Sequence, residues 1–179
     1  RGGPWIRPGT ALAGRPGPEA QRCTVRGEAR FEEGGAMKVV WHGRYPGYLE
    51  DARVAFGKAY GLGYMDFYAA GLVVPVKQMG IDYAAPLTFG QTCRITASLH
   101  WSEAARLNFS YRITDDTGAV LTTGYTVQLF LNTDREMLVA KPDLYADFCA
   151  RWAEGYFAGV SAGALSEGPW FFLPRSSRW

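Results

Sequence analysis

The sequence predicts an α+β domain in which one long helix packs on a curved antiparallel sheet. Three observations indicate this class. Apolar residues recur at helical spacing over residues 45–60, and three segments within residues 92–131 alternate apolar and polar residues as strands do. The chain has 179 residues, of which 47% are hydrophobic, so it can bury one core but is too short for two ordinary domains.

Composition divides the chain into three parts. Residues 1–21 are rich in Gly and Pro and show no periodicity, which is typical of an extension without a core. Residues 22–155 contain the periodic segments and form the predicted domain. Residues 156–179 are Gly-rich and then aromatic, and we predict no element for this C-terminal tail.

The elements of the first half follow from their periodicity. Residues 23–31 alternate as a strand, with Gly27 as a candidate bulge. Residues 45–60 form a helix that ends before Gly61, and a short helical segment is expected at 64–70. Residues 71–83 then read as an extended, largely buried strand, in which Pro75 marks an edge or a bend.

The second half gives the clearest strand signals. Residues 92–101 and 106–113 alternate strictly, and the turn DDTG joins the second of them to a third strand. The apolar face expected for that third strand consists of Leu121, Thr123, Tyr125, Val127, Leu129 and Leu131. A final helix is expected after Pro142. A sheet with exposed edges favours pairing between subunits, so we predict a homodimer or homotetramer.

Charge and residue content exclude several classes of function. The net charge of +2 is small and evenly spread, which argues against a nucleic-acid partner, and no run of about 18 uncharged apolar residues predicts a membrane span. Cys23, Cys93 and Cys149 fit no metal spacing and leave an odd thiol, which favours the reducing cytoplasm. We find no metal cluster, Gly-rich phosphate loop or Ser-His-Asp pattern, so neither a metal nor a cofactor is expected.

One stretch carries a specific motif. Residues 32–53 read EEGGAMKVVWHGRYPGYLEDAR, and Met37, Val39, Val40, Trp41, His42 and Tyr45 fall on the pattern D-x-x-G-x-V-(Y/W)-(H/Y)-x-x-Y. Together with KAYGLGYMDFY, YAAPLTFG and the three alternating strands, this stretch resembles the hotdog-fold acyl-CoA thioesterases of the 4-hydroxybenzoyl-CoA thioesterase type. The resemblance covers roughly residues 24–152.

The resemblance implies hydrolysis of an acyl-CoA or acyl-carrier thioester. In that family an Asp acts as nucleophile or general base, and a backbone amide at the helix start binds the thioester oxygen. Here the Asp position is Gly35, the family's loop glycine is Lys38, and the oxyanion amide falls at His42. An amide at a helix N-terminus can stabilise an oxyanion without a charged side chain. Gly35 cannot activate water.

Several residues are candidates for the missing catalytic group. Glu33 can reach the position if the Gly34-Gly35 pair bends, or it is a solvated loop acid. His42 can act as a base, or it serves mainly through its amide. Glu50 and Asp51 lie on the helix, where they are candidate acids or partners of Arg53 or Lys58.

On the substrate side the expected contacts are Trp41, Tyr45 and Tyr48, with Arg44 and Lys77 as partners for a CoA phosphate. Aromatic residues near the helix either line an acyl slot or form core; they are Tyr48, Phe56, Tyr64, Phe67 and Tyr68. Because Gly35 replaces the family's Asp, a non-catalytic protein that binds an acyl chain or acyl carrier is the alternative function.

Overall fold

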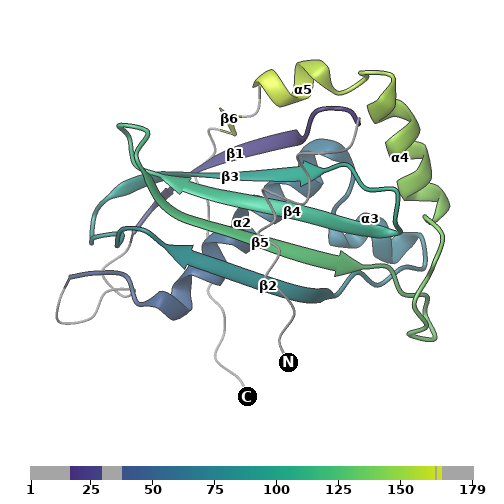
Figure 1. The fold of residues 1–179 in the computed structure, drawn as a ribbon, viewed down its shortest axis with the longest axis horizontal. Coiled ribbons are helices and arrows are strands. Elements are labelled where there is room, and N and C mark those ends of the chain that lie inside the picture. The colour runs from purple at the N-terminus through teal and green to yellow at the C-terminus, as the bar shows by residue number, and fades with distance from the viewer. Residues whose placement is uncertain (1–16, 30–37, 164, 167–179) are drawn as a thin grey trace.

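A computed structural model describes residues 17–29, 38–163 and 165–166 of the chain. Within these residues six strands form one sheet in the order β2-β5-β4-β3-β1-β6, and helix α2 lies across one face of it (Figure 1). The predicted arrangement of one long helix on an antiparallel sheet is therefore confirmed. We call the face of the sheet that contacts α2 the inner face.

Helix α2 is formed where its apolar spacing predicts it. It runs from Tyr45 to Tyr60, with Pro46 in its first turn, and follows the 3-10 helix η2 (His42–Arg44). Gly61 ends the helix in a left-handed conformation at φ 69°, which glycine adopts without steric cost. The shorter helix α3 spans Tyr64–Ala69.

The central strands form an antiparallel meander of β3 (Thr92–His100), β4 (Arg106–Thr114) and β5 (Val120–Leu129). On β3 and β4 the predicted apolar faces are buried, because both face α2. Strand β1 (Gln21–Glu28) pairs with β3 on one side of the meander, and β2 (Val76–Tyr83) pairs with β5 on the other.

Two details of the outer strands differ from the sequence prediction. Strand β1 pairs with β3 in continuous register from Gln21 to Glu28, so Gly27 is not a bulge. Most residues of β2 are exposed, so the prediction of a largely buried strand was wrong. These residues are exposed because β2, which begins just after Pro75, is the edge strand of the sheet and has a neighbouring strand on one side only.

The predicted face of β5 was also wrong for most of its length. Phe109 on β4 faces α2 and pairs with Thr126, and Leu107 pairs with Gln128. Since cross-strand partners share a face, the buried side of β5 carries polar residues. Thr122, Thr126 and Gln128 are buried, whereas Thr123, Tyr125, Val127 and Leu129 are only partly buried.

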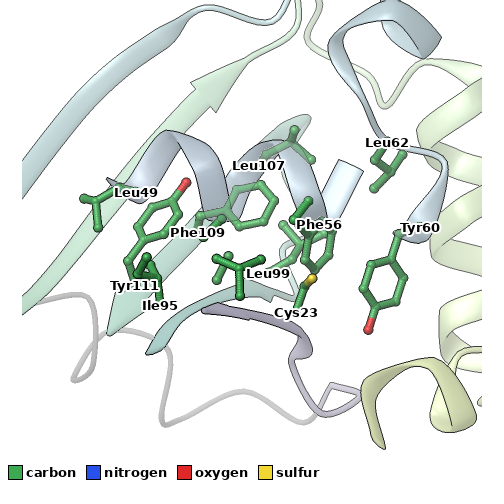
Figure 2. Packing of buried hydrophobic residues seen from close by; sticks show 14 of the residues in the cluster. Cys23, Leu49, Phe56, Tyr60, Leu62, Ile95, Leu99, Leu107, Phe109 and Tyr111 are labelled. Carbon is green, nitrogen blue, oxygen red and sulfur yellow. The ribbon is translucent and has the colours of Figure 1, made fainter. Parts of the chain in front are cut away.

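The core lies between α2 and the inner face of the sheet. Phe56 of α2 is fully buried, stacks on Tyr60 and meets the edge of Phe109 (Figure 2). Helix α4 (Asp143–Ala153) closes the core at one end. The chain past Gly155, for which we predicted no element, buries Phe157 and continues as α5 (Ala158–Gly163) and β6 (Leu165–Ser166).

Lys38 has the backbone conformation expected of the family's loop glycine. Its φ is 58°, and its carbonyl accepts a hydrogen bond from Phe89 at 3.0 Å, which holds it in place. A left-handed conformation costs a non-glycine residue about 1–2 kcal/mol, and glycine loses about 0.5–1 kcal/mol of chain entropy. We therefore expect Lys38→Gly to raise the free energy of unfolding in urea by about 0.5–1 kcal/mol.

The matched control is Ala59→Gly, at an exposed position of α2. There glycine relieves no strain, so stability should fall by about 1 kcal/mol. A loss of stability for both variants would show that Lys38 is unstrained.

Candidate active site

The start of α2 presents two free backbone donors. Trp41 precedes η2 in an extended conformation (φ −63°, ψ 135°), and its carbonyl accepts a hydrogen bond from the Arg44 amide at 2.9 Å. Within the described part of the chain, no acceptor is recorded for the N–H groups of His42 and Gly43. Such N–H groups at a helix start carry partial positive charge and suit an anionic oxygen.

Two tyrosines fix this turn against the rest of the fold. The His42 carbonyl accepts hydrogen bonds from the Tyr45 amide and from the Tyr83 hydroxyl, the latter at 3.1 Å. The Tyr45 hydroxyl accepts from the Leu87 amide at 3.0 Å, and the rings of Tyr45 and Tyr83 meet edge to face at 4.9 Å. The orientation of the peptide between His42 and Gly43 is thus set by α2 and by the edge strand β2.

Gly43 allows Trp41 to cover the turn. A Cβ atom at Gly43 would overlap Cζ3 of the Trp41 indole. The indole is 59% exposed, and its centre lies 5.0 Å from that of the His42 imidazole. Trp41 and His42 therefore form an exposed aromatic pair beside the two free amides.

The structure brings some predicted site residues together and separates others. Trp41, His42 and Arg44 are exposed at the turn, and Tyr45 and Tyr48 are buried directly beneath it. Lys77 lies six residues from Tyr83 along β2, which is about 20 Å in an extended strand, so it does not lie at the turn. Glu33 and Gly35 lie outside the described residues.

The aromatic residues proposed for an acyl slot also fall into two groups, one in the core and one more exposed. Phe56 and Phe67 are core residues, since each is at most 1% exposed. Tyr68 is 72% exposed on α3, and Tyr64 is partly buried. The slot interpretation therefore does not hold for Phe56 and Phe67.

The inner side of β2 offers an apolar surface that starts at the turn. Met79, Ile81 and Tyr83 pair with Thr126, Gly124 and Thr122 and so point to the same side as the core. Met79 is 41% and Tyr83 48% exposed, because the edge strand extends past the cover of α2. We call Met79, Ile81 and Tyr83 the β2 row.

Sequence reasoning missed the buried charge of Arg53. Its side chain is 1% exposed, its Nε donates to Gln128 Oε1 at 2.9 Å, and its Nη1 donates to the Leu62 carbonyl at 3.1 Å. Burial lowers the pKa of the Arg53 guanidinium from its usual value. A signal existed in the sequence, because Arg53 follows Leu49 by four residues and so falls on the apolar stripe of the helix.

The sequence made Glu50 and Asp51 candidate ion-pair partners of Arg53, and the structure shows no such ion pair in the described residues. Among the described residues, no carboxylate lies within 4.0 Å of its guanidinium. Instead the rings of Tyr64 and Phe109 lie 5.0 and 4.7 Å from its central carbon. Arg53 is thus in direct contact with neutral acceptors and aromatic faces, and the Glu50 carboxylate interacts with it electrostatically from farther away.

The described residues contain no group of three or more His, Cys, Asp or Glu that could hold a metal ion. Cys23, Cys93 and Cys149 are buried and stand outside any disulfide in the described residues. No described helix is long and apolar enough to cross a membrane.

Comparison with solved structures defines the class of this architecture. A DHNA-CoA thioesterase from Staphylococcus aureus is 24% identical, with 79% of this chain and 91% of that chain covered and a TM-score of 0.62. The hypothetical protein TT1821 from Thermus thermophilus is 30% identical, with 72% and 97% covered and a TM-score of 0.64. The protein has the hotdog fold, as predicted.

Sequence comparison then identifies the family. Residues 30–152 match the thioesterase-like superfamily, and the chain belongs to it. The "putative acyl-CoA thioesterase YneP" of Bacillus subtilis (strain 168) is 29% identical over 91 residues. These residues are 51% of this chain and 66% of that protein, so the match spans just under two thirds of that relative.

Proposed function

We propose that the protein hydrolyses an acyl-CoA or related acyl thioester, as enzymes of the 4-hydroxybenzoyl-CoA thioesterase type do. The observation that carries this proposal is the pair of free amides at His42 and Gly43, at the start of a 16-residue helix. Membership of the thioesterase-like superfamily supports it. Water adds to the thioester carbon, the C–S bond breaks, and the products are a carboxylic acid and a thiol that takes up the proton.

Each step of this reaction has a candidate group in the chain. The His42 amide, with the positive end of the α2 dipole behind it, stabilises the oxyanion that forms when water attacks. The base that activates water is the His42 imidazole or the Glu33 carboxylate, since Gly35 occupies the position of the family's Asp. No metal or cofactor is required for this chemistry.

The surroundings of the turn suggest how the substrate lies. The acyl group follows the β2 row away from the turn, because these side chains give it an apolar surface. Trp41 covers the thioester, and Tyr45 and Tyr48 support it from below. Arg44, exposed at the same turn, is the better partner for a CoA phosphate, since Lys77 lies at the other end of β2.

Free thiol release from a panel of short, long and aromatic acyl-CoAs tests this function. Turnover of at least one class supports hydrolysis, and loss of that turnover in Glu33→Gln would assign the base to Glu33. The alternative is a non-catalytic protein that binds an acyl chain or acyl carrier, which the glycine at position 35 favours. Tight binding of acyl-CoA without thiol release would establish that alternative.

The edge of β2 supports assembly into a homodimer or homotetramer. In the described residues β2 pairs only with β5, and the free edge carries the exposed apolar residues Val76, Met79 and Tyr83. We predict that light scattering at micromolar concentration gives at least twice the 19.7 kDa of one chain. A single monomeric species would contradict the proposed pairing.

The compartment that fits this protein best is the cytoplasm. All three cysteines are buried and form no disulfide in the described residues, whereas small domains in oxidising compartments tend to form them. Acyl-CoA thioesters as substrates agree with this location.

A further inference from the structure

Arg53 is a buried charge with one donor left over. Its side chain is 1% exposed, and among the described residues its Nη2 has no hydrogen-bond partner. Among the described residues, no carboxylate lies within 4.0 Å of the guanidinium. The Glu50 carboxylate interacts with Arg53 electrostatically from beyond that distance, so a group that accepts from Nη2 and carries negative charge would complete the site.

The neighbours of Arg53 hold the guanidinium in a fixed orientation. Gln128 Nε2 donates to the Val74 carbonyl at 3.0 Å and to the Tyr64 hydroxyl at 3.3 Å, which leaves its Oε1 to accept from Arg53. The Leu62 carbonyl accepts a hydrogen bond from Nη1. Because Nε and Nη1 are both engaged, Nη2 is a preorganised donor.

Two measures along the backbone give about 12 Å between the level of Arg53 and the two residues that bond the His42 carbonyl, Tyr45 and Tyr83. Arg53 follows Tyr45 by eight residues in α2, which corresponds to about 12 Å along the axis. On the facing strand, the β2 row runs four residues from Tyr83 to Met79, or about 13 Å. Met79 pairs with Thr126, two residues before Gln128, so the row ends beside the strand segment that binds Arg53.

We propose that Arg53 binds a carboxylate at the far end of the acyl group, so that the substrates are ω-carboxyacyl thioesters. This rests on the proposed function. An extended chain advances about 1.2 Å per bond, as three bonds span one residue of about 3.6 Å, so 12 Å corresponds to about ten bonds. Tyr64, which stacks on the guanidinium and is only partly buried, turns aside to admit the carboxylate.

The test compares decanedioyl-CoA with decanoyl-CoA, which differ only in the terminal carboxylate. The protein is expected to prefer decanedioyl-CoA by about tenfold or more in kcat/KM, since a hydrogen bond to a charged group discriminates by at least this factor. Arg53→Met should abolish the preference and Arg53→Lys should reduce it. The control is Arg94→Met on the opposite face of the sheet, where Arg94 is 45% exposed and pairs with Asp116; it should leave the preference unchanged.

Each outcome decides the inference. Equal kcat/KM for both substrates, or a preference that survives Arg53→Met, would show that Arg53 only braces α2 against Leu62 and Gln128. Melting curves establish folding, and if Arg53→Met does not fold, an unchanged preference in Arg53→Lys overturns the inference. If neither substrate is hydrolysed, the proposed function fails, and titration calorimetry decides this inference alone. Tighter binding of decanedioyl-CoA then supports it, and equal binding of the two overturns it.

Discussion

Replacing Gly35 by Asp is expected to raise thiol release at least about tenfold. The resemblance to the family puts a carboxylate at this position, and the amide proposed to bind the oxyanion is that of His42. General-base or nucleophilic assistance contributes roughly 100 to 10,000-fold, so even an imperfectly placed carboxylate should be visible. The measurement is initial thiol release from an acyl-CoA that both proteins bind.

Two controls separate the explanations for that result. Gly35→Asn introduces a side chain of nearly the same size as Asp but without a carboxylate, so it should leave the rate near that of the parent. Glu33→Gln in the parent tests whether Glu33, two residues before Gly35, supplies the catalytic carboxylate instead. If Gly35→Asp binds acyl-CoA but releases thiol no faster than the parent, the assignment of the catalytic position is wrong.

Removing the His42 amide is expected to lower thiol release by roughly 100 to 1,000-fold, the effect of losing one oxyanion donor. Proline at position 42 does this, because it has no N–H. The site tolerates it, since His42 is the first helical residue and Trp41 at ψ 135° already has the conformation that precedes proline. The rate is measured in the Gly35→Asp background if the parent is slow.

The matched variant is His42→Ala, which removes the imidazole and keeps the amide. Its loss of rate should be much smaller than that of His42→Pro. Melting temperatures of the two variants should be close, because no hydrogen bond from the His42 amide is recorded in the described residues. Equal loss of rate in the two variants would assign catalysis to the imidazole instead.

Local patterns were enough to predict the elements that make one face of the core. The spacing of α2 and its Gly61 stop gave both ends of the helix, and the strict alternation of β3 and β4 gave their buried faces. The face of β5 could not be read in this way. Thr122, Thr126 and Gln128 are buried because their partners on β4 face the helix, which is a property of the pairing and not of the strand's own composition.

The candidate site shows the same division between local and tertiary information. The turn at His42 lies within one contiguous motif, so the position of His42 at the start of the helix could be predicted from the sequence. Tyr83 reaches the His42 carbonyl from a strand 41 residues away, and Gln128 reaches Arg53 across 75 residues. Contacts of that separation depend on the sheet order, which periodicity alone does not specify.

The most direct test of the central claim observes the amide of His42 while a ligand is bound. Two analogues of the same acyl-CoA are compared in ¹H–¹⁵N spectra: a ketone in which CH₂ replaces the thioester sulfur, and a thioether without the carbonyl oxygen. If the amide binds the thioester oxygen, the ketone moves the His42 proton downfield and the thioether does not, while amides far from the turn, such as that of Ala59 in the last turn of α2, stay unchanged. Equal shifts of the His42 amide with both analogues would contradict an oxyanion site at the start of α2.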